Sequence, residues 1–322
     1  MTEWQIPETA RAAVQHELRP GATIALAEVP VHVPGPDELV IRTKAAGINP
    51  VDVKTSRGEG VAGGIPAAVR ATGVTLGWDI AGEVVAVGDA VTTFRPGDRV
   101  FGLVRFPALG GTFAEIVTVP AAEVRRIPDG VSFVEAAAVP LVALTAWQAL
   151  FDTATLAAGQ RVLVHGGSGG VGHVAIQLAT HVGAHVITTA SARNAEIVRE
   201  LGADEVIDYR TQRFEDLVRE VDVVLNTVEG DALARSWRVL RPGGIIVSIL
   251  ATPKVPSDAP TGARGRHILV HPDGEQIAAV ADLLARGALR PRIQRIGSLD
   301  ELPVLFAELH EGHVVGKLVV TF

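Results

Sequence analysis

The stretch that decides the fold is His165-Gly166-Gly167-Ser168-Gly169-Gly170-Val171-Gly172. It contains the pattern G-x-G-x-x-G, in which the first glycine permits a tight turn, the second lets a pyrophosphate approach the backbone, and the third allows close helix–sheet packing. An apolar run at 161–165 precedes it, a helical pattern at 171–181 follows, and a second apolar run lies at 184–189. This context predicts a dinucleotide-binding βαβ unit, because the helix N-terminus offers free N–H groups to phosphates. The residues expected to contact the cofactor are Gly167, Ser168, Gly169, Gly170, Val171 and Gly172.

The rest of the chain shows two different sequence patterns, one on each side of about residue 133. From about Phe133 onward, a long Ala-rich helical segment over 134–151 leads into alternating strands and helices, which predicts a parallel sheet with right-handed crossovers. The further strands expected are 205–208, 221–226, 244–249 and 267–270, with helices over 194–201 and 273–286 and a Pro/Gly-rich loop over 253–265. The first third carries short Val-rich runs separated by Gly and Pro turns, which favours a β-sandwich or barrel.

Composition excludes several classes of protein. With 322 residues, 48% apolar and 20% charged, the chain is long enough for about two packed domains, and global disorder is excluded. A net charge of −7 without a basic stripe argues against nucleic-acid binding. The absence of cysteine removes disulfides and thiolate zinc sites. Residues 1–8 do not form a signal peptide and no stretch is long enough to span a bilayer, so we expect a cytoplasmic protein without a membrane partner.

The end of the second strand indicates which dinucleotide is bound. NAD sites place an acid there, but residues 190–194 read Ala-Ser-Ala-Arg-Asn. Ser191 and Arg193 could bind a 2′-phosphate, which predicts NADPH. Ser191 could instead cap the next helix, and Arg193 could be a solvated surface residue. Because ligands lie beyond the carboxyl ends of the strands, the further cofactor contacts expected are Asn226, Thr227, Leu250 and Val270.

Several motifs in order support a family resemblance. They include Ala45-Ala46-Gly47-Ile48-Asn49-Pro50-Val51-Asp52, Gly77-Trp78-Asp79-Ile80-Ala81-Gly82, Arg95-Pro96-Gly97-Asp98-Arg99-Val100, Leu201-Gly202-Ala203-Asp204 and Gly316-Lys317-Leu318. Over nearly its whole length the chain resembles zinc-free medium-chain dehydrogenases/reductases of the NADPH:quinone oxidoreductase and alkenal/enone reductase branch. The resemblance implies an α/β fold: a GroES-like β-rich catalytic domain at 1–125 and 272–322, a Rossmann domain with a doubly wound parallel sheet at 126–271, and a homodimer.

The resemblance also implies roles for individual residues. Asn49 and Trp78 stand where zinc-dependent relatives carry a cysteine and a histidine ligand, so no metal is expected. Asn49 would lie beside the nicotinamide and donate to the substrate oxygen, or serve only as a turn residue before a proline. Asp52 would pin this loop, and Thr145 would lie near the nicotinamide ribose or be an ordinary helix residue. The other implied contacts are Tyr209 near the 2′-phosphate or adenine, Lys317 near the cofactor phosphates or simply solvated, and Arg57 and Trp78 in the substrate pocket.

These features lead to an expected reaction. Without a Lewis acid, hydride can still add to a carbon already activated by conjugation, as in a quinone or an α,β-unsaturated carbonyl. The resulting enolate needs a hydrogen-bond donor and a proton. One alternative is an enoyl-thioester or dedicated biosynthetic enone reductase, for which the candidate basic residues are Arg264, Arg266, Arg290, Arg292 and Arg295. A second alternative is a non-catalytic NADPH-binding sensor protein.

Overall fold

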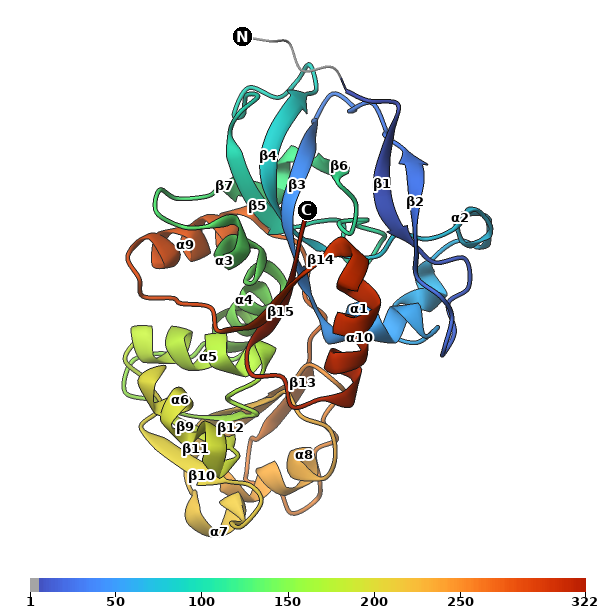
Figure 1. The fold of residues 1–322 in the computed structure, drawn as a ribbon. Coiled ribbons are helices and arrows are strands. Elements are labelled where there is room, and N and C mark those ends of the chain that lie inside the picture. Colours follow the sequence, from blue (N-terminus) through green and yellow to red (C-terminus); the bar gives the residue numbers. More distant parts are fainter. Residues whose placement is uncertain (1–5) are drawn as a thin grey trace. The chain divides into compact units, whose positions relative to one another are not determined.

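A computed structural model describes residues 6–322 of the chain (Figure 1). Residues 1–5, which belong to the segment predicted not to be a signal peptide, lie outside the described part. The chain divides into two compact units. The first contains the chain up to Leu141 together with His271–Gly287 and Ile293–Phe322, and the second contains Val142–Val270 and Ala288–Arg292. Within residues 6–322, no helix combines the length and apolar character needed to cross a membrane.

The second unit is built on a six-stranded parallel sheet with the order β10-β9-β8-β11-β12-β13. Numbered from β8, this order is 3-2-1-4-5-6, the doubly wound arrangement expected of a Rossmann fold. The strands are β8 (Arg161–His165), β9 (His185–Ala190), β10 (Glu205–Asp208), β11 (Val221–Asn226), β12 (Leu240–Ser248) and β13 (Arg264–His267). Most are apolar and buried, because helices cover both faces of such a sheet.

The helices of the second unit follow their strands; those predicted over 171–181 and 194–201 differ slightly at their ends, and three short helical segments after residue 210 were not predicted. They are α5 (Gly170–His181), η4 (Ala192–Asn194), α6 (Ala195–Glu200), α7 (Phe214–Leu217), α8 (Ala232–Arg235) and η5 (Ser236–Val239). The long helix predicted over 134–151 is instead three pieces: α3 (Phe133–Ala137), α4 (Pro140–Trp147) and a π-helical turn, η3 (Gln148–Thr153). Pro140 explains the first break, since proline lacks the N–H that would continue the preceding helix.

The first unit is rich in β-structure, as predicted for a GroES-like domain. Its seven-stranded sheet has the order β14-β15-β3-β4-β5-β7, with β6 pairing β3, and β1 and β2 form a separate antiparallel pair. The strands are β1 (Thr9–Val14), β2 (Ala25–Pro30), β3 (Glu38–Ile48), β4 (Asp79–Val87), β5 (Arg99–Leu103), β6 (Ile116–Pro120), β7 (Val124–Arg126), β14 (Ile293–Ser298) and β15 (Lys317–Thr321). The helices are α1 (Pro50–Ser56), η1 (Ala62–Gly64), α2 (Ala67–Thr72), η2 (Ala121–Glu123), α9 (Gly274–Ala285), η6 (Leu299–Glu301) and α10 (Leu302–Glu311).

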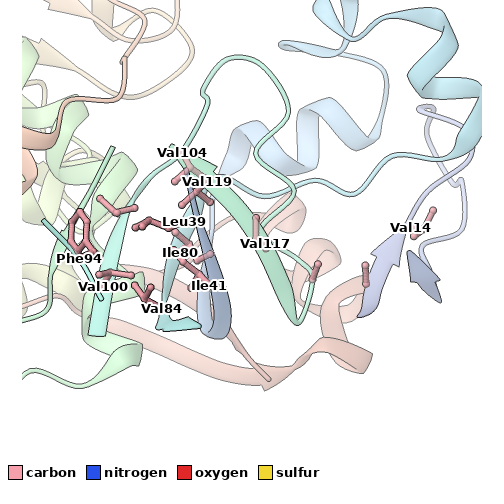
Figure 2. Close-up of a cluster of buried hydrophobic side chains, with 13 residues drawn as sticks. Val14, Leu39, Ile41, Ile80, Val84, Phe94, Val100, Val104, Val117 and Val119 are labelled. Atoms are coloured by element: carbon pink, nitrogen blue, oxygen red, sulfur yellow. The ribbon is translucent and has the colours of Figure 1, made fainter. Parts of the chain in front are cut away.

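The core of the first unit lies between its strands. Figure 2 shows Leu39 and Ile41 of β3, Ile80 of β4 and Val100 of β5 in one buried cluster with Val119 of β6. Each buried aliphatic side chain of this size contributes roughly 1.5–3 kcal/mol relative to an exposed one. The long strand β3 pairs with β4, β6 and β15 in the same sheet. Its last residues lead directly into Asn49 and α1.

Two boundaries differ from the sequence prediction. The first unit extends to Leu141 rather than ending at residue 125, because α3 packs on β3, β4 and β5 and the Leu141 N–H donates to Asp79 in β4 at 2.7 Å. Residues 288–292 lie with the second unit, where the backbone of Arg290 exchanges hydrogen bonds with Gln177. The strand predicted at 267–270 is β13 at Arg264–His267, so it begins three residues earlier, within the last two residues of the segment predicted as a loop.

Candidate functional site

The glycine turn lies between β8 and α5, as the dinucleotide-binding pattern requires. A Cβ on Gly172 would lie 2.1 Å from the carbonyl oxygen of Gly166, and one on Gly167 would lie 2.0 Å from Thr188 Oγ1. Side chains at either position would collide with the turn or the sheet. Gly169 begins α5 in an extended conformation, and a Cβ there would meet only the Gly166 carbonyl, at 3.3 Å. The turn is thus as tight as a pyrophosphate site needs, with the helix N-terminus beside it.

Two residues of this segment have further local roles. Ser168 Oγ accepts a hydrogen bond of 3.0 Å from Asn194 Nδ2, which ties the turn to the start of α6. Val171 is partly buried in the first turn of α5. A helix of this length presents unsatisfied N–H groups and a partial positive charge at its N-terminus, so the residues present fit a dinucleotide pyrophosphate.

The carboxyl ends of β9 and β10 bring the predicted 2′-phosphate residues together. Ala190 pairs with Asp208, and the Tyr209 N–H donates to the Ala190 carbonyl at 3.3 Å, so residues 191 and 209 leave adjacent strands at the same edge. Arg193 is exposed and forms no ion pair within residues 6–322. The alternative that Ser191 caps the next helix is not realised, since its side chain makes no cap bond.

Sequence analysis missed a second cation at this edge. Arg210 is exposed and stacks over the 55% exposed ring of Tyr209, with 5.9 Å between guanidinium carbon and ring centroid. No described carboxylate forms an ion pair with Arg193 or Arg210. The signal was present in the sequence as the pair Tyr209-Arg210 following the third predicted strand. The end of β9 carries no acid, and the Asp208 carboxylate at the end of β10 accepts from the Arg210 backbone N–H and the Thr211 hydroxyl. Two exposed arginines beside an acid-free end of β9 suit a phosphate better than a ribose hydroxyl.

The other predicted cofactor residues lie at or beyond the carboxyl ends of the remaining strands. Asn226 ends β11, is buried, and has an Oδ1 atom without a hydrogen-bond partner, while Thr227 Oγ1 donates to the His165 carbonyl at 2.7 Å. Leu250 follows β12 and is partly exposed. Val270 is buried beyond β13. An orphaned buried oxygen at this edge is consistent with a ligand donor completing it.

The first unit contains a buried polar cluster made of Asn49, Asp52, Asp79 and Lys317. Asn49 precedes Pro50 in extended conformation, as the residue before a proline must, and begins α1. Its Nδ2 donates to Asp79 Oδ2 at 2.8 Å and its Oδ1 accepts from Lys317 Nζ. The Asn49 backbone N–H donates to Asp52 Oδ2 at 2.7 Å. These bonds join the end of β3, the start of α1, β4 and β15 at one point.

Burial controls the ionisation of this cluster. Desolvation raises the pKa of Asp52 to about 8, and the nearby charge of Asp79 adds to the rise, against the Asn49 N–H and the Lys317 ammonium. Burial also raises the pKa of Asp79 and lowers that of Lys317, opposed by the ion pair in which Nζ lies 3.5 Å from Asp79 Oδ2. With its pKa at about 8, Asp52 is largely protonated at neutral pH, and the ion pair of Lys317 with Asp79 opposes the desolvation of those two groups.

The structure corrects two predictions for the site. Lys317 is 2% exposed, and its ammonium donates to the Ile48 carbonyl at 2.7 Å as well as to Asn49 and Asp79, so it has no donor left for a phosphate. Trp78 is fully buried, donates from Nε1 to the Ala108 carbonyl at 2.6 Å and packs edge-on against Phe106. It therefore belongs to the core and offers no surface to a substrate.

The other residues predicted for the catalytic site and the substrate pocket are Arg57, Thr145, Asn49 and Asp52. Arg57 follows α1, is partly exposed, and lies 3.8 Å from Glu59. Thr145 is buried in α4. Asn49 is fully buried with both ends of its amide engaged, so its place in the cluster is shown, while direct donation to a substrate stays a prediction. Asp52 holds the turn before α1 through its bond to the Asn49 N–H, as expected of a residue that pins this loop.

Asp79 is a further residue to which sequence analysis gave no role. It accepts from Asn49 and from the Leu141 N–H, the latter at the start of α4, and pairs with Lys317. Its signal was an acid at the start of a mostly apolar strand, next to the apolar Trp78 and Ile80; an acid that is buried in such a place is usually paired. Among residues 6–322, no group of three or more His, Cys, Asp or Glu side chains is arranged to hold a metal ion.

Comparisons with known proteins agree with this geometry. Residues 35–129 match the alcohol dehydrogenase GroES-like domain, and residues 201–320 match the zinc-binding dehydrogenase family. The chain is 32% identical to the mitochondrial NAD(P)H oxidoreductase RTN4IP1 of Danio rerio, covering 89% of this chain and 84% of that protein. It is 35% identical to the 2-methylene-furan-3-one reductase of Solanum lycopersicum, covering 88% and 71%.

A solved structure extends the similarity to the whole fold. The quinone oxidoreductase from Coxiella burnetii superposes with a TM-score of 0.87 at 33% identity, over 98% of this chain and 99% of that one. The similarity therefore covers nearly the whole length of both chains. The chain belongs to the quinone-oxidoreductase branch of the medium-chain dehydrogenase/reductase superfamily, a family of nicotinamide-dependent oxidoreductases.

Proposed function

We propose that this protein is an NADPH-dependent oxidoreductase that transfers hydride to a quinone or an α,β-unsaturated carbonyl without a metal. The observation that carries the cofactor assignment is the absence of an acid at the end of β9, where Ser191 and Arg193 follow the strand, beside a glycine turn in which side chains at Gly167 and Gly172 would collide. The names of the tomato and Coxiella relatives, an enone reductase and a quinone oxidoreductase, support the two acceptor classes.

Residues of the second unit would bind the cofactor. The backbone of Gly167–Gly172 and the N-terminus of α5 would hold the pyrophosphate, with Ser168 fixing the turn to α6. Arg193, Ser191 and Tyr209 would take the 2′-phosphate end, helped by Arg210. Asn226, Thr227, Leu250 and Val270 would line the other strand ends, and Thr145 would approach the nicotinamide ribose. When bound, NADPH supplies the hydride.

The first unit would supply the substrate side. The cluster of Asp79, Lys317 and Asp52 holds Asn49 in one orientation at the end of β3, and the Nδ2 hydrogen that Asp79 does not accept would be the donor that positions a substrate carbonyl. Arg57 would contribute to the substrate pocket. The absence of cysteine from the sequence, and of a His/Cys/Asp/Glu cluster from residues 6–322, favours acceptors already activated by conjugation over simple alcohols. A homodimer and a cytoplasmic location stay predictions.

The alternative thioester reductase has weaker support. Of the five arginines considered for a coenzyme A patch, Arg295 is already bound by Glu301 at 2.9 Å and Glu308 at 3.1 Å. A patch of the remaining four would hold the coenzyme phosphates less firmly. A non-catalytic NADPH-binding role would be supported by cofactor binding without oxidation by any acceptor.

Cofactor preference is the direct experiment on this proposal. Arg193→Ala should weaken NADPH binding by roughly tenfold or more, the loss expected for a charge-assisted hydrogen bond, and leave NADH binding unchanged. Arg199→Ala, which removes an exposed arginine six residues further along the chain, in the last turn of α6, is the matched control and should change neither dissociation constant. Equal affinity of the wild-type protein for NADH and NADPH, or an unchanged NADPH dissociation constant for Arg193→Ala, would overturn the NADPH assignment.

A further inference from the structure

A buried histidine lies directly behind the glycine turn. His165 ends β8, and its imidazole packs edge-on against Phe214 at 4.6 Å between ring centroids. Nδ1 lies 3.2 Å from Thr189 Oγ1, and Nε2 lies 3.0 Å from Ser236 Oγ. Burying an imidazole in a sheet core costs free energy unless both ring nitrogens are hydrogen-bonded, a cost that an aliphatic side chain would not carry.

The hydrogen bonds around His165 define which nitrogen carries the proton. Ser236 Oγ donates its one hydrogen to the Ala232 carbonyl at 2.7 Å, so it accepts from His165 Nε2–H. His165 Nδ1 then accepts from the hydroxyl of Thr189. Burial, reinforced by the charge of Arg235 and opposed by that of Glu215, lowers the pKa of His165 to about 4. The ring is therefore neutral at physiological pH, as the two bonds require.

The same threonine holds the first residue of the turn. The Gly166 N–H donates to Thr189 Oγ1 at 3.1 Å, and the Gly167 N–H donates to the Thr189 carbonyl at 3.0 Å. Gly166 has φ +74°, and a Cβ there would lie 2.7 Å from Val228. Its carbonyl accepts from the Gly169 N–H at 3.0 Å. Gly166 is thus the pivot of the turn, and the Thr189 hydroxyl fixes the orientation of its N–H.

We propose that His165 is a positioning residue for the dinucleotide pyrophosphate. Through the hydrogen-bonded series Ala232–Ser236–His165–Thr189–Gly166, it locks the pivot of the glycine turn and couples that turn to α8. The series orients the Thr189 lone pair toward Gly166, because the threonine proton is committed to the imidazole. The inference rests on the proposed binding of NADPH, and His165 itself touches no cofactor atom.

The experiment measures NADPH dissociation constants directly, without turnover. His165→Phe keeps the ring volume but loses both hydrogen bonds, and Thr189→Val loses the hydroxyl. Each should raise the NADPH dissociation constant roughly tenfold, the loss expected for one or two neutral hydrogen bonds. Thr189→Ser keeps the hydroxyl and should restore affinity to within about twofold of wild type. Val223→Ala, a core change in β11, is the control for a general loss of stability.

A second readout tests the hydrogen-bonded series without cofactor. In 15N-histidine-labelled protein, the His165 signals should show the Nε2–H tautomer and should not titrate above pH 5. Hydrogen exchange of the Gly166 amide should accelerate in both His165→Phe and Thr189→Val but not in Val223→Ala. An Nδ1–H tautomer, unchanged exchange, or wild-type NADPH affinity in Thr189→Val would overturn the proposal. If the wild-type protein did not bind NADPH at all, the proposed function would be wrong. The tautomer and exchange results would still show whether the hydrogen-bonded series from Ala232 to Gly166 exists.

Discussion

The buried pair of Lys317 and Asp79 gives the sharpest test of the cluster in the first unit. Lys317→Met keeps an unbranched chain of similar volume but removes the ammonium. The variant leaves the Asp79 carboxylate with the Asn49 amide and the Leu141 N–H but without a cation. Removing one partner of a buried pair costs about 3–5 kcal/mol in unfolding free energy. The loss should be smaller near pH 5 than near pH 8, because burial already raises the pKa of Asp79 and protonation relieves the unpaired charge.

A double-mutant cycle separates the ion pair from simple packing. Lys317→Met combined with Asp79→Asn should cost clearly less than the sum of the two single changes, since neither partner is left charged and alone. Lys44→Met is the matched control, because Lys44 pairs with Glu83 at 3.4 Å at a partly exposed position and should lose under about 1 kcal/mol. The assay is urea unfolding followed by circular dichroism, with NADPH binding measured on the folded variants.

Three results would contradict the interpretation of Lys317 as a buried counter-ion of Asp79. A loss below 1 kcal/mol for Lys317→Met, or strict additivity with Asp79→Asn, would contradict the buried ion pair. A tenfold loss of NADPH affinity in a folded Lys317→Met variant would show that Lys317 contacts the phosphates after all. We expect NADPH affinity within about twofold of wild type.

Three further predictions concern single residues. Gly172→Ala should raise the NADPH dissociation constant at least tenfold by titration calorimetry, because the new Cβ would lie 2.1 Å from the Gly166 carbonyl oxygen; wild-type affinity would contradict the turn geometry. Asp52→Asn should gain stability relative to wild type as pH rises from 4 to 8, because a carboxyl whose pKa is raised to about 8 loses its stabilising contribution over that range; a pH-independent difference would contradict it. For His165 the pH dependence of stability has the opposite sign, because burial lowers its pKa to about 4, against 6.5 in the unfolded chain. The unfolding free energy of the wild type should fall by about 3 kcal/mol as pH falls from 6.5 to 4, and His165→Gln should lack this loss in unfolding titrations.

Much of the second unit could be predicted from local patterns. Strand and helix alternate in sequence, and the glycine pattern marks where the first crossover begins, so the sheet order follows from general rules of handedness and packing. The strand β13 was misplaced because Arg264-Gly265-Arg266-His267 has no apolar run; it lies at the sheet edge, where exposure removes the periodic signal. The break at Pro140 was visible in the sequence but was outweighed by the apolar run around it.

The candidate site was harder to predict where partners are distant in sequence. Asn49 and Asp52 lie within four consecutive positions of one motif. Lys317 follows Asn49 by 268 residues in the sequence and contacts it only because β15 pairs with β3. No local pattern states that pairing, so a lysine that looked like a phosphate ligand is a buried counter-ion. The sequence alone gives His165 no role, since its partners Thr189 and Ser236 lie 24 and 71 positions away.

The central claim is metal-free hydride transfer from NADPH to a conjugated acceptor. Its most direct test is the rate of NADPH oxidation by purified protein with an ortho-quinone and a conjugated enal side by side, each with and without a metal chelator. We predict oxidation with at least one acceptor, slower with NADH, and unchanged by the chelator. Bound NADPH that neither acceptor oxidises, or activity that the chelator abolishes, would contradict the account.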